Sequence, residues 1–400
     1  MFCEATLMIN EKMRELGATR SVIRELFEYG RMRKAEVGAE RVYDFSLGNP
    51  SVEAPLAVNE AIARLVNEVP SVVLHGYTSA QGDAGVRGAI AEHINRTEGE
   101  QITADCIYLT VGAAAAIASS LSAVVTPGEE VIVPAPYFPE YKVWIERAGG
   151  VIKPVACDKD FKPDAEAIGA AITERCAAVI INSPNNPTGA VYGEECIREL
   201  CEVLKRRSRE LGRTIYLIAD EPYRELVYDG VTVPYLTKFY DETLVCYSFS
   251  KSLSLPGERI GYVLVSPRMA EREAVYQAVA GAARALGYVC APSLLQRILP
   301  ECLGLTADIS VYDRNRRLLL EKLTEYGYEV VRPEGAFYLF VKSPSGDAAE
   351  FSERAKKFDI LIVPSDSFGV GGYARLAYCV TTEEVERALP AFGKLIESYK

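Results

Sequence analysis

Short apolar runs alternate with helix-like segments through the middle of the chain. The runs are rich in β-branched residues and cover residues 107–111, 131–134, 178–182, 215–219, 244–247 and 260–265. Continuous runs of this kind are typical of strands that are buried on both faces. Their alternation with helices predicts an α/β fold with a mostly parallel sheet flanked by helices, whose sites lie at the carboxyl ends of the strands.

The two ends of the chain have a different pattern. Residues 21–35 have the periodicity of an amphipathic helix, and residues 42–47 that of an extended segment. After residue 292 we expect helices at 308–326 and 381–398 and strands at 335–341, 360–363 and 374–379. At 400 residues the chain exceeds what one core usually organises. We expect a large domain (51–290), a smaller α+β domain (291–400), and an N-terminal segment (1–50) that joins the small domain.

Charge and composition exclude several kinds of partner. The net charge of -11 repels nucleic-acid backbones and anionic membrane surfaces. Only two histidines occur, His75 and His93, so a histidine-based metal centre is not expected. The ten cysteines contain no Cys-x-x-Cys pair, and the amino terminus has no apolar stretch of signal-peptide length. We expect a cytoplasmic protein without a metal.

One lysine stands between hydroxyl residues at the end of an apolar run. Ser248, Ser250 and Lys251 follow the run 244–247, and Arg259 comes shortly after them. A lysine in a desolvated, electropositive site loses its proton and can form a Schiff base with a carbonyl. Hydroxyl groups and a guanidinium beside it can hold a phosphate. The segment suits a phosphate-bearing aldehyde, although a solvated basic loop would have the same composition.

The residues from 248 to 262 read Ser-x-Ser-Lys, then Pro-Gly, then Arg-x-Gly-Tyr. This pattern resembles the cofactor-lysine signature of the class I/II, fold type I aminotransferases that depend on pyridoxal phosphate, such as the aspartate and aromatic aminotransferases. The resemblance implies that Lys251 carries pyridoxal 5'-phosphate. It also implies that Ser248, Ser250 and Arg259 bind the phosphate of the cofactor.

Two further motifs follow strand-like runs in the order that the family has. Asn186 lies in the Asn-Pro-Thr-Gly segment after the run 178–182, and the resemblance places it on the ring oxygen of the cofactor. Asp220 follows the run 215–219, and a carboxylate beside the pyridine nitrogen keeps that nitrogen protonated. By resemblance Tyr223 donates to the ring oxygen. On composition alone the first motif could be a plain turn and Asp220 a helix cap.

Small and aromatic residues complete the expected cofactor site. Gly112, Ala113 and Ala114 open a helix, where backbone N–H groups can approach a phosphate. By resemblance Phe138 lies flat against the pyridine ring, with Tyr141 nearby. Tyr137 is the alternative if the register is shifted by one residue. A tightly packed core is the alternative explanation for the small residues at 112–114 and for the aromatic residues at 137–141.

The resemblance also implies a substrate site and a dimer. Arg375, an arginine in an otherwise apolar strand, would bind the α-carboxylate of the substrate with Gly48 and Asn186. Tyr77 would reach across a homodimer to the phosphate of the partner's cofactor. A second cation for an acidic side chain is left open among Arg20, Arg24 and Arg284.

The implied reaction is ping-pong transamination between an L-amino acid, aspartate-like or aromatic, and a 2-oxo acid such as 2-oxoglutarate. Lys251 would be both tether and proton carrier, with Asp220 and Tyr223 supporting it. A lyase of the same fold, such as an aminocyclopropane carboxylate synthase or a carbon-sulfur β-lyase, is the alternative. A cofactor-binding regulator is disfavoured, because the chain has neither the length nor the basic charge for an added DNA-binding domain.

Overall fold

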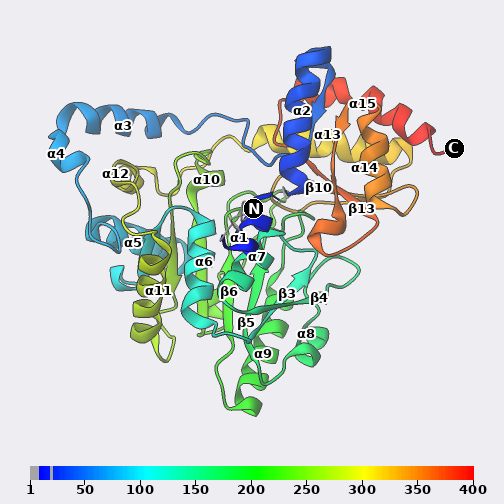
Figure 1. The fold of residues 1–400 in the computed structure, drawn as a ribbon. Coiled ribbons are helices and arrows are strands. Elements are labelled where there is room, and N and C mark those ends of the chain that lie inside the picture. The colour runs from blue at the N-terminus through cyan, green and yellow to red at the C-terminus, as the bar shows by residue number, and fades with distance from the viewer. Residues whose placement is uncertain (1–8, 19–20) are drawn as a thin grey trace, which may run out of the picture.

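A seven-stranded sheet forms the centre of the computed structural model, which describes residues 9–18 and 21–400 (Figure 1). The strands lie in the order β2, β8, β7, β6, β5, β3, β4. Their bounds are β2 (Ile107–Thr110), β3 (Glu130–Ala135), β4 (Val151–Ala156), β5 (Cys176–Asn182), β6 (Tyr216–Asp220), β7 (Thr243–Ser248) and β8 (Gly261–Val265). β8 runs antiparallel to both of its neighbours, β2 and β7, and the other strand pairs of this sheet are parallel. The expected α/β fold with a mostly parallel sheet is confirmed.

Both faces of this sheet are covered by helices, which explains the continuous apolar runs. Neighbouring residues of one strand join different cores: Leu217 packs on one face, and Ile218 on the other. The first face carries α3 (Leu56–Glu68), α5 (Ala84–Glu98), α8 (Ala165–Ala171), α9 (Glu194–Leu211) and α12 (Ser293–Cys302). The second carries α6 (Ala113–Val124), α7 (Glu140–Arg147) and α11 (Arg272–Leu286). A strand between two such layers needs apolar side chains at every position.

A second core lies in the carboxyl-terminal part of the chain. Its antiparallel sheet has the order β12, β13, β10, β9, and β1 pairs in parallel with β11. The strands are β1 (Tyr43–Asp44), β9 (Val330–Val331), β10 (Tyr338–Lys342), β11 (Ile360–Leu361), β12 (Val363–Pro364) and β13 (Tyr373–Ala377). The helices around them are α2 (Val22–Val37), α13 (Ser310–Tyr326), α14 (Ala348–Lys356) and α15 (Thr382–Glu397). Figure 1 shows α2 beside this part of the molecule, where its Leu26 packs on Val363 and Phe368. The division into domains stays a prediction.

Short elements complete the chain. The remaining helices are α1 (Glu11–Ala18), α4 (Ser71–Leu74), α10 (Phe249–Ser252) and the 3-10 turns η1 (Ala39–Arg41), η2 (Ala104–Cys106), η3 (Leu236–Lys238) and η4 (Ser365–Phe368). Within the described residues, no helix combines the length and the apolar character that a bilayer crossing requires.

Two of the sequence expectations need correction. The edge strand β4 was not expected, because most of its residues are exposed or half-buried and no apolar run marks it. The strand expected at 335–341 begins only at Tyr338. Before it, the N–H groups of Gly335 and Ala336 donate to the carbonyls of Gly189 and Leu226, so this backbone bonds to loops instead of a strand.

We predict that Ile218→Ala destabilises the protein by about 2–5 kcal/mol, because it opens a cavity in the centre of the sheet. Ile218 is fully buried in β6. Met32→Ala on the exposed surface of α2 is the control and should change stability by less than about 0.5 kcal/mol. Urea unfolding measures both, and equal midpoints for the two variants would contradict the packing described here.

Candidate active site

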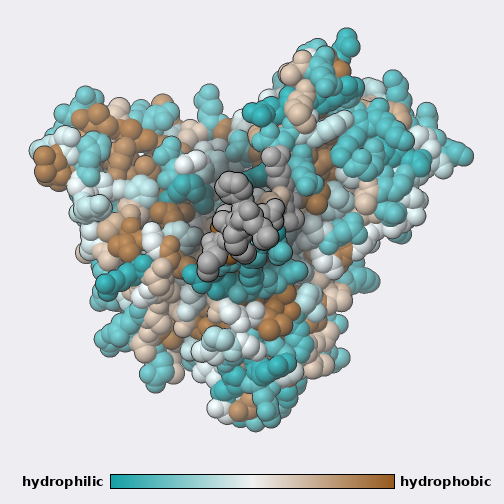
Figure 2. All heavy atoms as spheres, viewed as in Figure 1, coloured by the Kyte–Doolittle hydropathy of each residue, from teal (hydrophilic) through white to brown (hydrophobic). Residues whose placement is uncertain are grey.

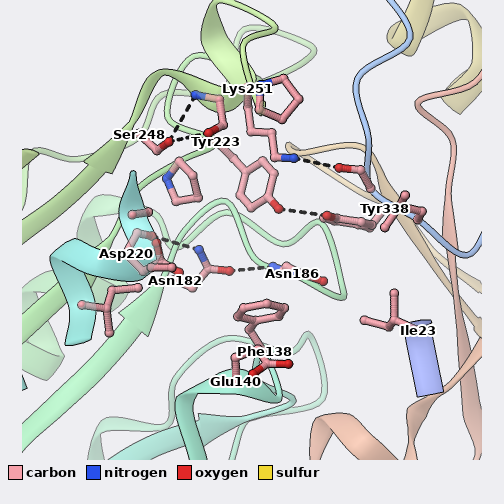
Figure 3. Close-up of a pocket in the computed structure, with 18 of the residues that line it drawn as sticks. Ile23, Phe138, Glu140, Asn182, Asn186, Asp220, Tyr223, Ser248, Lys251 and Tyr338 are labelled. Carbon is pink, nitrogen blue, oxygen red and sulfur yellow. Dashed lines mark hydrogen bonds between the residues drawn. The ribbon is translucent and has the colours of Figure 1, made fainter. Parts of the chain in front are cut away.

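A pocket of about 520 Å³ lies where β5, β6 and β7 end (Figure 3). Asn182 and Asp220, the last residues of β5 and β6, are directly paired in the sheet. The pocket brings together most of the residues that the sequence predicted for the site: Gly48, Ala113, Ala114, Phe138, Asn186, Asp220, Tyr223, Ser248, Ser250, Lys251, Arg259 and Arg375. Residues as distant in the sequence as Gly48 and Arg375 therefore share one cavity.

Lys251 projects from the short helix α10 toward the loop at Gly48 (Figure 3). Its Nζ donates a hydrogen bond to the Gly48 carbonyl at 2.7 Å. Burial lowers the pKa of Lys251 to about 8, and the nearby charges of Arg259 and Arg375 act in the same direction. A side chain at position 48 would clash with the Tyr338 hydroxyl, so glycine is required for this approach. The amine is thus poised to lose its proton near neutral pH.

One end of the pocket is built to receive an anion. The Ser248 and Ser250 hydroxyls lie 2.6 Å apart, and α6 begins at Ala113 on the facing side. Gly112 does not line the pocket itself. It adopts a φ of +91°, and a Cβ there would lie 2.8 Å from Nη2 of Arg259. Helix N–H groups, hydroxyls and a guanidinium are the donors that a phosphate prefers.

Asp220 supplies a buried carboxylate at the end of β6. Its Oδ2 accepts a hydrogen bond from the Tyr141 hydroxyl at 2.5 Å, whereas Oδ1 has no partner among the described residues. Burial raises the pKa of Asp220 to about 7; the Tyr141 hydrogen bond opposes this, and the charge of Glu221 adds to it. A cationic N–H beside Oδ1 would satisfy this oxygen and stabilise the ionised form.

Arg375 comes from β13 and is almost completely buried. Its Nη1 donates to Asn186 Oδ1 at 3.1 Å, and its Nη2 donates to the Ser46 carbonyl at 2.5 Å. The guanidinium carbon lies 4.7 Å from the centre of the Tyr338 ring. Nε has no partner among the described residues. The cation therefore has a free donor and can take a carboxylate.

Sequence reasoning missed residues that organise these groups. Asn182 donates to the Asp220 carbonyl at 2.9 Å and accepts from the Asn186 N–H at 2.7 Å. The Tyr338 and Tyr223 hydroxyls lie 2.9 Å apart. Asn182 could have been found from the sequence, because it is a polar residue at the end of an apolar run. Tyr338 could not, because it lies within an apolar strand and has no polar neighbour to mark it.

The mouth of the pocket contains side chains that only the fold could bring here. Ile23, Arg24 and Phe27 reach it from α2, and Glu140 and Trp144 reach it from α7. Arg24 was one of the three candidates for a second cation. Arg284 is not among the pocket residues, and Arg20 lies outside the described residues.

Three aromatic or acidic residues, Tyr77, Tyr137 and Glu221, do not line the pocket. Phe138 lines the pocket and packs edge to face on Tyr141, whereas Tyr137 lies against the backbone of Gly369. Glu221 points away from the pocket and pairs with Arg224 at 2.6 Å. Tyr77 is outside the pocket and 99% exposed.

Exposed apolar side chains precede Tyr77 in the sequence. Figure 2 shows hydrophobic residues gathered over α3 and α4, where Leu56, Val72 and Val73 are exposed to 70, 87 and 51%. Apolar groups gathered in this way often mark an interface with another protein.

Comparison with known proteins agrees with this geometry. Residues 40–392 match the family described as aminotransferase class I and II. The chain belongs to this family. It is 32% identical to the probable aspartate/prephenate aminotransferase of Thermus aquaticus over 358 residues, which is 88% of this chain and 90% of that relative. The expected family, the cofactor pyridoxal phosphate and the transaminase activity are therefore confirmed, and the relatives' names favour this activity over the lyase.

Solved structures have the same fold. An aminotransferase from Eubacterium rectale is 53% identical, with a TM-score of 0.97 that covers 99% of this chain and 100% of that one. The aspartate aminotransferase of Thermus thermophilus with maleate is 28% identical, with a TM-score of 0.85 over 98% of this chain and 100% of that one.

The residues of the pocket fit this cofactor. The unpartnered Oδ1 of Asp220 suits the pyridinium N–H, and the donors around Ser248 and Arg259 suit the phosphate. Lys251 lies in the same cavity with a lowered pKa, as a tether for an aldehyde requires.

We predict that Lys251 titrates near pH 8 in the cofactor-free enzyme, because burial penalises its ammonium form. Reductive ¹³C-methylation followed by NMR should show one dimethyl-lysine signal with this midpoint, while exposed lysines titrate near pH 10. The Lys251→Arg variant assigns the signal. If the signal that disappears in this variant titrates with the exposed lysines, the desolvated site is wrong.

Proposed function

We propose that the pocket residues divide the work of transamination as follows. Lys251 tethers pyridoxal phosphate, and Ser248, Ser250 and Arg259 bind its phosphate. The backbone N–H groups at Gly112, Ala113 and Ala114 help to bind it, and no side chains at these positions block the approach. The hydroxyl pair of Ser248 and Ser250 and the start of α6 line the same cavity.

Asp220 keeps the ring nitrogen protonated, Asn186 and Tyr223 donate to the ring oxygen, and Phe138 packs on the ring. When bound, the cofactor supplies a pyridinium ring that accepts the electron pair left after removal of the α-proton. Tyr141 donates a hydrogen bond to one oxygen of Asp220, and the other oxygen, which no described residue contacts by a hydrogen bond, accepts from the ring nitrogen. The Asn182 amide holds the Asp220 and Asn186 backbones together.

Arg375 binds the α-carboxylate of the amino acid, together with Asn186 and the backbone at Gly48. This contact fixes the α-hydrogen relative to Lys251, whose Nζ then takes the proton and returns it. A lysine with a pKa of about 8 is partly unprotonated near neutral pH, so it can both take up and return a proton.

Arg24 selects acidic side chains. Among the residues that the structure describes, the cations that line the pocket are Arg24, Lys251, Arg259 and Arg375, and the last three have the roles above. Ile23, Phe27 and Trp144 form an apolar wall beside Arg24, which also suits an aromatic side chain. The substrate class is thus an aspartate-like or aromatic L-amino acid, with 2-oxoglutarate as the generic acceptor. The names of the aspartate/prephenate relative and of the maleate-bound structure support this range.

The enzyme acts as a cytoplasmic homodimer in which Tyr77 binds the phosphate of the partner's cofactor. Exposure of Tyr77 outside its own pocket and the apolar side chains on α3 and α4 support this arrangement. Residues 51–290 form the large cofactor-binding domain. Residues 291–400 form the small domain, which residues 1–50 join.

The observation that carries the function is the presence of Lys251, Asp220 and Arg375 in one cavity, where Asp220 and Arg375 each have a buried atom with no partner in residues 9–18 and 21–400. The purified holoenzyme should show a change in the visible absorbance of its cofactor with aspartate, glutamate or aromatic amino acids. Each reactive donor should yield its matching 2-oxo acid, and Lys251→Ala should abolish turnover. Release of ammonia and pyruvate would support the lyase instead.

We predict that Arg24→Gln lowers kcat/KM for aspartate about tenfold, the effect of one charge-assisted hydrogen bond. The value for phenylalanine should change little, because the apolar wall remains. Arg31→Gln on the same helix is the control, since Arg31 is exposed and pairs with Glu28. Equal losses with aspartate and phenylalanine would remove Arg24 from substrate selection.

Hybrid dimers test the role of Tyr77. A hybrid of one Tyr77→Ala subunit and one Lys251→Ala subunit contains one intact site only if Tyr77 acts across the interface. Such a hybrid should have about half of the wild-type activity, because one of two equal sites is complete. Differently tagged subunits allow its purification. A hybrid no more active than the two parent homodimers would place Tyr77 in its own subunit's site or in none.

A further inference from the structure

A second cavity, of about 270 Å³, lies on the other side of α10 from the active site. Ser250 and Lys251 of α10 line the active-site pocket, whereas Phe249 and Ser252 line this one, which we name the rear cavity. Its residues come from α5, α10, the end of α12, β7, β8, and the loops that follow β6 and α12: Ile90, His93, Ile94, Thr97, Glu98, Arg224, Glu225, Tyr235, Tyr247, Phe249, Ser252, Tyr262, Cys302, Leu303, Gly304 and Leu305. None of them has a role in the transamination described above.

Aromatic rings form much of its wall. Tyr247 and Tyr262 are stacked with ring centres 5.0 Å apart, and Phe249 packs edge to face on Tyr247 at 5.0 Å. Tyr235 is 3% exposed, and its hydroxyl has no partner among the described residues. Faces of aromatic rings attract cations, and their area suits an apolar body.

A carboxylate in this wall is only half satisfied. The Tyr247 hydroxyl donates to Oε1 of Glu225 at 2.8 Å, but Oε2 is buried and without a partner among the described residues. Burial raises the pKa of Glu225, against the Tyr247 hydrogen bond and the charge of Arg224. A cation with an N–H group beside Oε2 would satisfy this oxygen and offset the cost of the buried charge.

The one arginine of the wall is already occupied. Arg224 donates from Nε to Glu221 at 2.6 Å and from Nη1 and Nη2 to the carbonyls of Val233 and Pro234 at 3.0 and 2.9 Å. Burial lowers the pKa of His93, so its ring is neutral at pH 7. Among the described wall residues, none offers a free positive charge to a ligand's carboxylate. These charges favour a positively charged ligand. An amino acid is disfavoured, because its carboxylate would have no cation to bind.

We propose that the rear cavity binds a small organic ammonium ion that has an apolar body and no carboxylate. Glu225 accepts the hydrogen bond of its N–H group, and Tyr235, Tyr247 and Tyr262 contact the body. The site also differs from the substrate pocket in its chemistry. Arg375 in the substrate pocket recognises a carboxylate, which this ligand lacks. The Tyr247 hydroxyl also forms a hydrogen bond with the Ser252 hydroxyl at 2.9 Å. Ser252 directly follows Lys251 in α10, so this cavity adjoins the residue next to the active-site lysine.

N,N-dimethylbenzylamine is a suitable probe, because it is protonated at neutral pH and a tertiary amine cannot form a Schiff base with the cofactor. Saturation-transfer NMR titration of the holoenzyme should show saturable binding. N,N-dimethylbenzamide, which is neutral and similar in shape, should not bind. The Glu225→Gln variant keeps an acceptor for Tyr247 and should weaken binding of the amine at least about tenfold.

Two further variants test whether the amine binds in the rear cavity or elsewhere on the molecule. Leu305→Trp, at a position that is 37% exposed, should block the cavity without disturbing the fold and abolish binding. Glu92→Gln, on the exposed side of α5, should bind as the wild type does. An unchanged melting temperature establishes that each variant is folded. The proposal is overturned if no saturable binding occurs, if the amide binds equally, or if neither Glu225→Gln nor Leu305→Trp weakens binding.

Discussion

The active site depends on one buried carboxylate, Asp220. Its position at the end of β6 removes it from water, which raises its pKa to about 7. Tyr141 satisfies one of its oxygens, and the Asn182 amide holds its backbone. The second oxygen has no partner in the part of the chain that the structure describes, so the site stabilises a positively charged partner more strongly than an exposed aspartate would. A protonated pyridine ring is such a partner.

The same desolvation that raises the pKa of Asp220 lowers the pKa of the cations in the pocket. Burial lowers the pKa of Lys251 to about 8 and also lowers the pKa of Arg375. Lysine can lose its proton at pH values that a cell reaches, whereas arginine stays charged. In the proposed mechanism, one low-dielectric cavity thereby provides a lysine that can exchange a proton and an arginine that keeps its charge for a carboxylate. The protein's net charge of -11 makes these local cations the means of holding anionic ligands.

The sequence was most informative where local pattern and chemistry coincide. Buried strands produce continuous apolar runs, and Asn186, Asp220 and Lys251 follow such runs, so the sheet and its site could be predicted together. Arg24 and Trp144 enter the pocket only through the packing of α2 and α7, which no local pattern encodes. Tyr338 belongs to an apolar strand and carries no polar signal. The edge strand β4 was missed because half-exposed strands lack a continuous run.

The protonation state of the cofactor's ring nitrogen tests the role of Asp220 most directly. ¹⁵N NMR of the enzyme loaded with ¹⁵N-labelled pyridoxal phosphate reports this state without turnover. Above neutral pH, the wild type and the Glu221→Gln control should keep the nitrogen protonated, and Asp220→Asn should leave it unprotonated. The same ring-nitrogen signal in wild type and Asp220→Asn would contradict the account.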